Sequence, residues 1–289
     1  MDIVIREATL EDSQACGRIL YHAFKNINQK HGFNNQEVPS EDSGNKMANF
    51  FIKHHNFFGR VAEYKGQISG VIFIDERNPK LIGLNIMAVS DEVQGKGIGR
   101  SLLQLVIDRC KKAPGARFLQ HTFNTHALGL YTSLGFDVRE PIVLIDGKPK
   151  SQVQSGVEVR RMEYKDLDSC SKLCEKVYGF SREEELKDAM YLFKPYVAVQ
   201  SGVVKAYLSA TDNWAQNHGV AENENDMQLL IIGIASDIPQ QLSFLVPLRK
   251  SDFLRWCLNE GFRIVKPFTL MSMHEYIKPT GLYFTSINY

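Results

Sequence analysis

Three glycines that alternate with larger residues are the part of this sequence most suited to binding a ligand. Gly95, Gly97 and Gly99 have no side chains, so a ligand could lie directly against the main chain there, and backbone amides would point outward. Residues 84–89 before them are apolar except for Asn85, which predicts a strand covered on both faces. The residues after them are apolar at helical spacing: Leu102, Leu103, Val106 and Ile107. A helix N-terminus with unpaired N–H groups would face the turn, which predicts an anion site.

Two common glycine motifs do not fit this turn. The dinucleotide fingerprint requires a third glycine where Arg100 stands, and the P-loop requires Ser or Thr after its lysine, whereas Gly97 follows Lys96. Residues 94–99 instead fit Gln/Arg-x-x-Gly-x-Gly/Ala, the acyl-CoA pyrophosphate loop of the GNAT N-acyltransferase superfamily. At this turn the chain resembles that family.

A second stretch, which lies downstream in the order typical of the family, supports the resemblance. It predicts a short helix that ends at Gly135 in a left-handed cap, with a strand-like run at 118–122 before it and the next strand starting at Phe136. The residues that match are Asn124, Ala127, Leu130, Tyr131, Leu134, Gly135 and Phe136. Two motifs in the right order make a strong joint signal.

The resemblance implies a fold, a cosubstrate and a site. The expected fold class is α+β, with two tandem GNAT-like domains, each a mixed, mostly antiparallel sheet flanked by helices. The implied cosubstrate is acetyl-CoA, and no metal is expected. Its pantetheine arm would pair with main-chain groups of the motif strand, and its pyrophosphate would lie on the amides of the turn, with Lys96 or Arg100 as counter-charge. The implied cofactor-binding residues are Met87, Ala88, Val89, Gln94, Gly95, Lys96, Gly97, Ile98, Gly99, Arg100 and Asn124, the last as a pantetheine contact or a helix cap.

The implied reaction is direct attack of a primary amine on the acetyl carbonyl. Tyr131 stands where the family often places its general acid, which would protonate the thiolate leaving group; a core tyrosine is the alternative. Deprotonating a lysine-like amine costs roughly 4–5 kcal/mol at pH 7, so the base matters more than the acid. The sequence does not assign the base: a water chain would serve, as would Glu63, Asp75, Glu76, His121 or His126.

Composition limits the classes of protein. The chain has 289 residues and a formal net charge of +1, and its basic residues are spread out, so neither nucleic acid nor an anionic membrane is expected as the main partner. The sequence has no apolar run near the length of a membrane span and no signal-peptide pattern, and its five cysteines are expected to be buried thiols. We therefore expect a cytoplasmic protein whose partner is a small-molecule or protein amine.

Taken in order, the chain suggests two domains. Residues 2–6 are strand-like, and Thr9 with Asp12 resembles a capping box for a helix that runs to about Lys30. Lys65 and Gly66 mark a hairpin turn. Residues 146–151 are a polar, turn-rich break, which predicts domains 1–150 and 151–289.

The second half begins like the first. A shift of 154 places Ile5-Arg6 on Val159-Arg160 and Asp12 on Asp166, and a shift of 126 places Gly135-Phe136 on Gly261-Phe262. A shift of 146 places residues 86–94 on 232–240, and the three motif glycines then fall on Gln241, Ser243 and Leu245. We therefore expect domain 1–150 to be catalytic and domain 151–289 to be a degenerate copy without the pyrophosphate loop.

Two further segments bear on the acceptor. In the resembled family, residues 21–58 cover the acceptor site, and here they are rich in aromatic and histidine residues, for which core packing or solvation is the plainer interpretation: Tyr21, His22, Phe24, His31, Phe33, Phe50, Phe51, His54, His55, Phe57 and Phe58. The closing segment 278–289 is expected to pair into a sheet, either completing the second fold or reaching toward the acceptor cleft.

Two functions fit these observations. The first is an N-acetyltransferase, and the alternative is a non-catalytic acyl-CoA-binding sensor or interaction module. Tyr131 beside an intact loop favours the enzyme.

Overall fold

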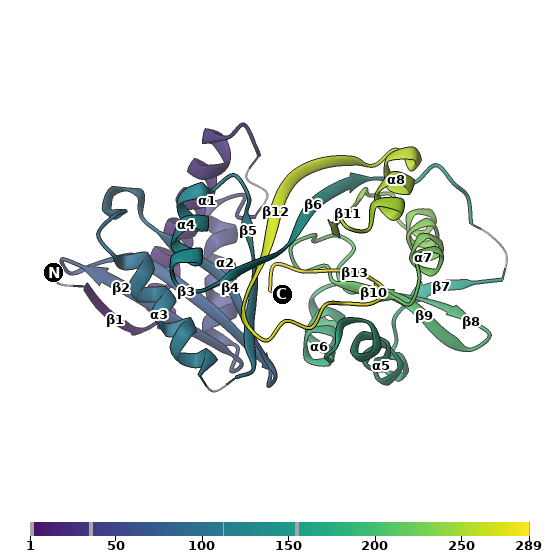
Figure 1. The fold of residues 1–289 in the computed structure, drawn as a ribbon, viewed down its shortest axis with the longest axis horizontal. Coiled ribbons are helices and arrows are strands. Elements are labelled where there is room, and N and C mark those ends of the chain that lie inside the picture. The colour runs from purple at the N-terminus through teal and green to yellow at the C-terminus, as the bar shows by residue number, and fades with distance from the viewer. Residues whose placement is uncertain (1–2, 35–36, 112, 154–155, 289) are drawn as a thin grey trace. The chain divides into compact units, whose positions relative to one another are not determined.

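The computed structural model describes residues 3–34, 37–111, 113–153 and 156–288, which fall into two compact units (Figure 1). Unit 1 contains residues 1–137, 271–275 and 288–289, and unit 2 contains residues 138–270 and 276–287. Residue 2, at the start of the expected first strand, and Tyr289, at the end of the closing segment, lie outside the described residues. Among the helices of the described ranges, none is both long and apolar enough to span a membrane.

Unit 1 contains a sheet in which β1, β2, β3 and β4 pair antiparallel in that order and β5 runs parallel to β4. Its strands are β1 (Ile3–Glu7), β2 (Phe57–Tyr64), β3 (Gln67–Asn78), β4 (Leu81–Val89) and β5 (Gly115–His121). Its helices are η1 (Leu10–Asp12), α1 (Ser13–Lys30), α2 (Glu41–Lys53), η2 (Asp91–Val93), α3 (Ile98–Cys110) and α4 (Thr125–Ser133). The expected hairpin is confirmed, with Lys65 and Gly66 at φ of 52° and 75° between β2 and β3.

Helices cover both faces of this sheet (Figure 1). On one face, α1 and α2 bury Leu20 and Phe51 against Phe73 of β3. On the other face, α3 buries Leu102 and Leu103 together with Phe118, Tyr131 and other side chains of β5 and α4. The apolar stretch of β4 is covered on both sides, as the sequence predicts, because its side chains contribute to both clusters.

Unit 2 repeats this order of elements. Its strands are β6 (Asp137–Gly147, all but its first residue), β7 (Glu158–Arg161), β8 (Tyr196–Gln200), β9 (Val203–Leu208), β10 (Gly219–Ala221), β11 (Leu242–Pro247), β12 (Arg263–His274, whose last four residues belong to unit 1) and β13 (Leu282–Phe284). Its helices are η3 (Tyr164–Asp166), α5 (Leu167–Tyr178), α6 (Glu183–Leu192), α7 (Glu224–Asp237) and α8 (Ser251–Glu260). Strands β7 to β10 pair antiparallel in chain order, like β1 to β4.

The start of the repeat is the same down to its side chains. Arg6 and Asp12 lie 2.7 Å apart and Arg160 and Asp166 lie 2.6 Å apart, and each aspartate closes a capping box at the start of a short 3-10 helix. The shift of 154 residues is therefore confirmed. The predicted fold class, two GNAT-like domains with mixed, mostly antiparallel sheets, is confirmed as well.

Two details of the sequence-based prediction differ from the structure. The division between the units falls at residue 137 rather than 150, because β6 pairs with β11 through residues 142–147 and its Val143 and Ile145 lie in the unit 2 core. The shift of 146 is wrong, because it places residues of β4 on helix α7 and the motif glycines on or beside β11. The order of elements instead makes β10 and α7 the counterparts of β4 and α3.

Candidate functional site

The glycine turn of unit 1 has the geometry that its sequence predicts. Gly95 and Gly97 have φ of 77° and 90°, in the left-handed region that favours glycine, and Gly97 is the N-cap of α3. A Cβ atom at either position would meet nothing within 4 Å. The turn therefore presents bare main chain to open space. A Cβ at Gly99 would be 3.4 Å from Leu130 of α4, so this third glycine lies in a more closely packed place.

The amides at the start of α3 are available to an anion. The first intrahelical bond runs from Ser101 N–H to the Gly97 carbonyl at 3.0 Å, so the N–H groups of Ile98, Gly99 and Arg100 precede the helical ladder. No acidic residue lies in the first turn of α3, and Gly97 supplies no capping side chain. The positive end of the helix dipole is left for a ligand.

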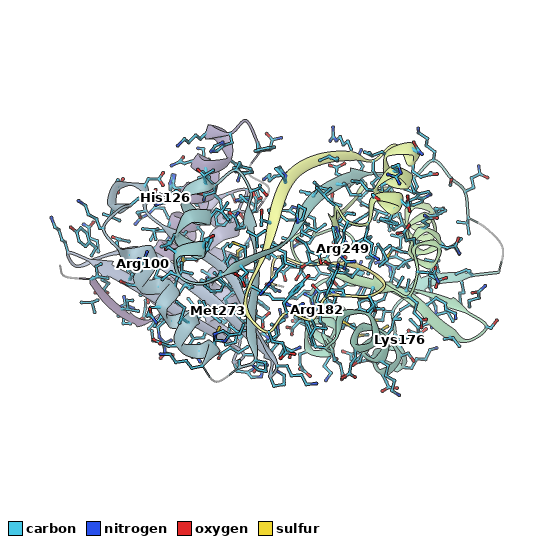
Figure 2. The ribbon with its side chains drawn as sticks, in the orientation of Figure 1. Arg100, His126, Lys176, Arg182, Arg249 and Met273 are labelled. Carbon is cyan, nitrogen blue, oxygen red and sulfur yellow. The ribbon has the colours of Figure 1, made fainter. Side chains whose placement is uncertain are left out.

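Charged and polar side chains surround the turn. Lys96 and Arg100 are exposed, and the Arg100 guanidinium, labelled in Figure 2, donates to Ser133 of α4 at 2.9 Å. Gln94 turns back to donate to Asp91 at 2.7 Å. Arg100 thus has a fixed direction toward α4, whereas the Lys96 side chain has no hydrogen bond or ion pair with any residue that the structure describes.

The free edge of β4 lies directly before the turn. The pairing of β4 with β5 within the described residues joins only Ile82 to Ala116 and Gly83 to Arg117, although β4 continues to Val89. Ser90 N–H donates to β3 at Ser69 O, 2.9 Å away. Because successive strand residues direct their main-chain groups to opposite edges, those of Val89 and Met87 face away from β3. The main-chain groups of Ala88 face β3, so the cofactor contact predicted for Ala88 would have to come through its side chain.

Two buried side-chain amides lie on the strands that diverge here. Asn85 of β4 and Gln120 of β5 are 6% and 4% exposed, and both polar atoms of each side chain have no hydrogen-bond partner within the described part of the chain. Asn85 also sits at a bulge, where Phe73 and Ile74 of β3 pair with Ile86 and Leu84. Buried amides normally find partners, so these residues fit a site completed by a polar ligand.

Asn124 and Tyr131 lie on α4, after β5. The Asn124 side chain caps the helix by accepting from Ala127 N–H at 3.1 Å, which confirms the capping alternative without testing a ligand contact. The Tyr131 ring packs 4.5 Å from Phe118 and is 8% exposed, and burial raises the pKa of its phenol above the ordinary value. Tyr131 is therefore protonated at every physiological pH and is also part of the core.

Three of the five candidate bases are bound to arginines. Glu63 accepts from Arg6 at 2.7 Å, and Asp75 forms a buried pair with Arg77 at 2.6 Å. Glu76 pairs with Arg109 at 2.7 Å, and partial burial raises the pKa of its carboxyl. His126 is exposed on α4 (Figure 2). The guanidinium groups of Arg6 and Arg77 already donate hydrogen bonds to the carboxylates of Glu63 and Asp75.

His121 stands apart from the other candidates. Its Nε2 lies 2.8 Å from Glu37 Oε1, and both side chains are 7% exposed. The second oxygen of Glu37 accepts from Asn28 at 3.1 Å, and the Phe24 ring lies edge-on to the imidazole at 5.7 Å. Position 121 is at the end of β5, on the face covered by α1. A carboxylate that holds one ring nitrogen orients the imidazole.

The structure divides the aromatic stretch 21–58 into two groups. Phe51 and Phe57 are core residues, as the plainer interpretation predicted, with Phe50 packed against them. A second group gathers at the end of β5: Phe33 stacks on Phe123 at 4.6 Å and His31 lies 5.1 Å from the same ring. His121 stacks on Phe123 as well, at 4.9 Å.

The sequence patterns do not identify Glu37, Gln120 or Phe123 as candidate site residues. Gln120, like Asn85, is a polar residue within an apolar strand, and that signal could have identified it. Glu37 lies in an irregular connection far from His121 in sequence, and nothing in its neighbourhood predicts the pairing.

Comparisons with known proteins agree with the resemblance that the fold and the glycine turn carry. Residues 21–136 match the model of the Acetyltransferase (GNAT) family. The predicted resemblance is thereby confirmed for residues 21–136, the part of the chain that the family model matches. A curated relative, UPF0157 protein YqkA from Bacillus subtilis, is 32% identical over 102 residues, which are 35% of this chain and 29% of that protein. This chain therefore spans less than a third of that relative.

Solved structures extend the likeness of fold to the whole chain. A protein from Pyrococcus horikoshii, provisionally described as an acetyltransferase, aligns with a TM-score of 0.77 at 17% identity over 99% of this chain and 94% of its own. A tandem GNAT protein from the clavulanic acid biosynthesis pathway aligns with a TM-score of 0.61 at 10% identity over 94% of this chain and 98% of its own. At such low sequence identities, these alignments show a similar fold and nothing further.

Proposed function

We propose that unit 1 is an N-acetyltransferase that transfers an acetyl group from acetyl-CoA to a primary amine. The observation that carries this proposal is the bare N-terminus of α3 next to the edge of β4 that, within the described residues, does not pair with β5 beyond Gly83. The amides from Gly95 to Arg100 suit a pyrophosphate, although that of Lys96 also donates to the Val93 carbonyl at 3.4 Å. The main-chain groups of Met87 and Val89 that face away from β3 suit an amide-containing arm added like a strand, which would replace the 3.4 Å bond from Gln94 Nε2 to the Val89 carbonyl. The orphaned amides of Asn85 and Gln120 offer it further polar contacts.

Acetyl-CoA would supply the acetyl thioester, and this chain's side chains would manage the protons. The amine nitrogen forms the new bond to the carbonyl carbon as the carbon–sulfur bond breaks. Tyr131 donates its phenolic proton to the departing sulfur and regains one from solvent. Burial that raises the pKa of Tyr131 also favours the protonated form of a thiol in the same cleft, so the transfer remains feasible.

His121 is the proposed acceptor of the amine proton. Glu37 Oε1 lies 2.8 Å from its Nε2 and orients the ring. The two carboxylates of Glu63 and Asp75 are bound to arginines, which leaves them poorly suited to the role. His121 also lies on the α1 face, where residues 21–58 would cover the acceptor.

A panel of amines with detection of released thiol tests this function. Wild-type protein should release CoA thiol only with acetyl-CoA and an acceptor amine together. Acetyl-CoA binding without thiol release for any amine class would support the sensor alternative instead. His121→Gln should lower kcat/KM about 10-fold or more at pH 7, and the loss should shrink toward pH 10, where the amine deprotonates without help. His126→Gln, on exposed α4, is the matched control and should behave like wild type.

A further inference from the structure

The closing segment of the chain occupies the gap in unit 2 that corresponds to the proposed acyl-CoA gap of unit 1. In unit 1 this gap opens between β4 and β5, and in unit 2 its counterparts are β10 and β11. Strand β13 pairs antiparallel with β10 through Leu282, Tyr283 and Phe284. The next residue, Thr285, forms a bridge with Leu245 of β11. The segment thus contacts both strands that border the gap.

The segment enters the gap at the N-terminal end of α7. A Cβ atom at Gly281 would be 2.4 Å from the Ala221 carbonyl oxygen, so the chain passes directly against the end of β10. Two residues, Glu222 and Asn223, separate β10 from α7. From this point the segment runs back along β10 toward Gly219. It follows the course that a ligand would take from the helix N-terminus into the gap.

The side chains of the segment are buried on both faces of β13. Phe284 stacks on Phe244 of β11 at 4.4 Å and lies 5.6 Å from Phe253 of α8. Tyr283 lies edge-on to Tyr178 of α5 at 5.1 Å. Leu282, Tyr283 and Phe284 are each at most 1% exposed, so the gap is filled by apolar side chains.

Two arginines, both labelled in Figure 2, fix the ends of the segment. Arg249 donates to Pro279 O at 2.8 Å, and its guanidinium lies 5.3 Å from the centre of the Tyr283 ring. Arg182 is buried, pairs with Glu185 and donates to Ser286 Oγ at 2.6 Å. Ile287 N–H donates to Ala215 O at 2.9 Å. The segment is held by specific polar contacts as well as by apolar burial.

We propose that residues 281–286 are a built-in peptide ligand of unit 2, bound by strand addition in the gap between β10 and β11. The recognised ligand is an extended peptide with large apolar side chains at Leu282 and Phe284, an aromatic ring at position 283 and a hydroxyl at position 286. Its equivalence to an acyl-CoA arm rests on the function proposed for unit 1, whereas its binding in the gap does not.

Cleavage of the folded chain tests the proposal. A site for a sequence-specific protease is inserted between Lys278 and Pro279, next to an exposed residue, and the full-length protein is cut after folding. The fragment 279–289 should remain bound through gel filtration. After its removal in denaturant and refolding, a labelled peptide of the same sequence should bind one to one. Prompt loss of the fragment from the cut protein would overturn the proposal.

Peptide variants show whether the recognition is specific. Phe284→Ala should weaken binding about 100-fold or more, because it empties a fully buried position. Gly281→Val should weaken it at least about 10-fold through the clash with Ala221, and Thr280→Ser, at an exposed position, is the matched control that should bind like wild type. Equal binding of the Phe284→Ala peptide would overturn the proposal.

Hydrogen exchange on the intact chain covers the case in which the cut protein does not refold without its fragment. The amides of residues 282–284 should exchange as slowly as those of 206–208 in the neighbouring β9. Exchange at the rate of an exposed loop would overturn the proposal. None of these measurements involves acetyl-CoA, so failure of the acetyltransferase function would leave their results unchanged.

Discussion

Helices α3 and α7 occupy corresponding positions in the two copies of the fold. Their N-termini differ in the capping residue, in the charge of the first turn and in the length of the preceding connection, and each of these affects anion binding. Helix α3 begins at Gly97, which has no side chain, and its first turn has no acidic residue. Helix α7 begins at Asn223, whose side chain accepts from Asp226 N–H at 3.0 Å, and its first turn carries Glu224 and Asp226. Eight residues, 90–97, lead into α3, and two lead into α7.

If the proposed function is correct, this difference explains why the N-terminus of α3 would bind an anion and that of α7 would not. In unit 2 the side-chain cap satisfies one of the first amides, and two carboxylates offset the positive end of the helix dipole. The gap beside α7 contains β13, whereas β4 pairs with β5 only at Ile82 and Gly83 among the described residues. The connection that leads into α7 is therefore shorter than the one that leads into α3. The shift of 146 predicted instead a connection of equal length with larger side chains in place of the glycines.

The largest expected effect on ligand binding is that of a substitution at Gly97. We expect Gly97→Asp to weaken acetyl-CoA binding at least about 100-fold, because it places a carboxylate at the proposed pyrophosphate position, on a residue with φ of 90°. Gly66→Asp is the matched control, since Gly66 also has positive φ and open space around it in the β2–β3 hairpin. Calorimetry on both folded variants measures the effect, and wild-type affinity in Gly97→Asp would disprove the cofactor site.

Tyr131 and Cys257 are related by the 126-residue shift, and only the tyrosine can donate a proton from a phenol. We expect Tyr131→Phe to lower kcat about 100-fold while leaving the acetyl-CoA affinity unchanged, the pattern of a lost general acid. Tyr64→Phe, on strand β2, is the control. If steady-state rates at saturating substrates do not change, Tyr131 is a core residue only, like its packing partner Phe118.

The Arg6–Asp12 and Arg160–Asp166 pairs should contribute similarly to the stability of the protein. We expect Asp12→Asn and Asp166→Asn each to destabilise the protein by about 2 kcal/mol, because each weakens a charged, partly buried hydrogen-bond network. Asp42→Asn, which removes an exposed pair with Lys46, is the control and should cost less than about 0.5 kcal/mol. Urea unfolding measures these differences. A large effect in one copy and none in the other would contradict their equivalence.

The pH dependence of these pairs has a defined sign. Arg6 lowers the pKa of Asp12 to about 2, and Arg160 lowers the pKa of Asp166. The stabilisation is therefore complete above the ordinary aspartate pKa of about 3.9 and is lost as the pH falls toward the folded-state value. The difference between wild type and Asp12→Asn should shrink between about pH 4 and pH 2.

The smallest expected effect concerns the cap of α7. Asn223→Ala should lower stability by about 1 kcal/mol and the melting temperature by about 3 °C, because one amide of the helix loses its partner. Acetyl-CoA affinity should not change. If this variant bound a second acetyl-CoA molecule, the Asn223 cap alone would prevent binding in unit 2, and β13 would have no part in preventing it.

Local signals in the sequence predicted the parts of the site that are contiguous in the chain. The glycine turn, the α4 motif, the β2–β3 hairpin and the Arg6–Asp12 start each lie within a few residues, so spacing and turn chemistry define them. The insertion of β13 beside β10 and the pairing of β6 with β11 depend on contacts between distant residues. The Glu37–His121 contact joins residues 84 apart, which no periodicity predicts.

The number of acetyl-CoA molecules bound per chain tests the contrast between the two copies most directly. Equilibrium dialysis of the wild-type protein should give one bound molecule per chain, and Gly97→Asp should give none at the same ligand concentrations. Two molecules per chain, or one that persists in Gly97→Asp, would contradict the account, because unit 2 would then bind the ligand that its closed helix start and its own closing segment are proposed to exclude.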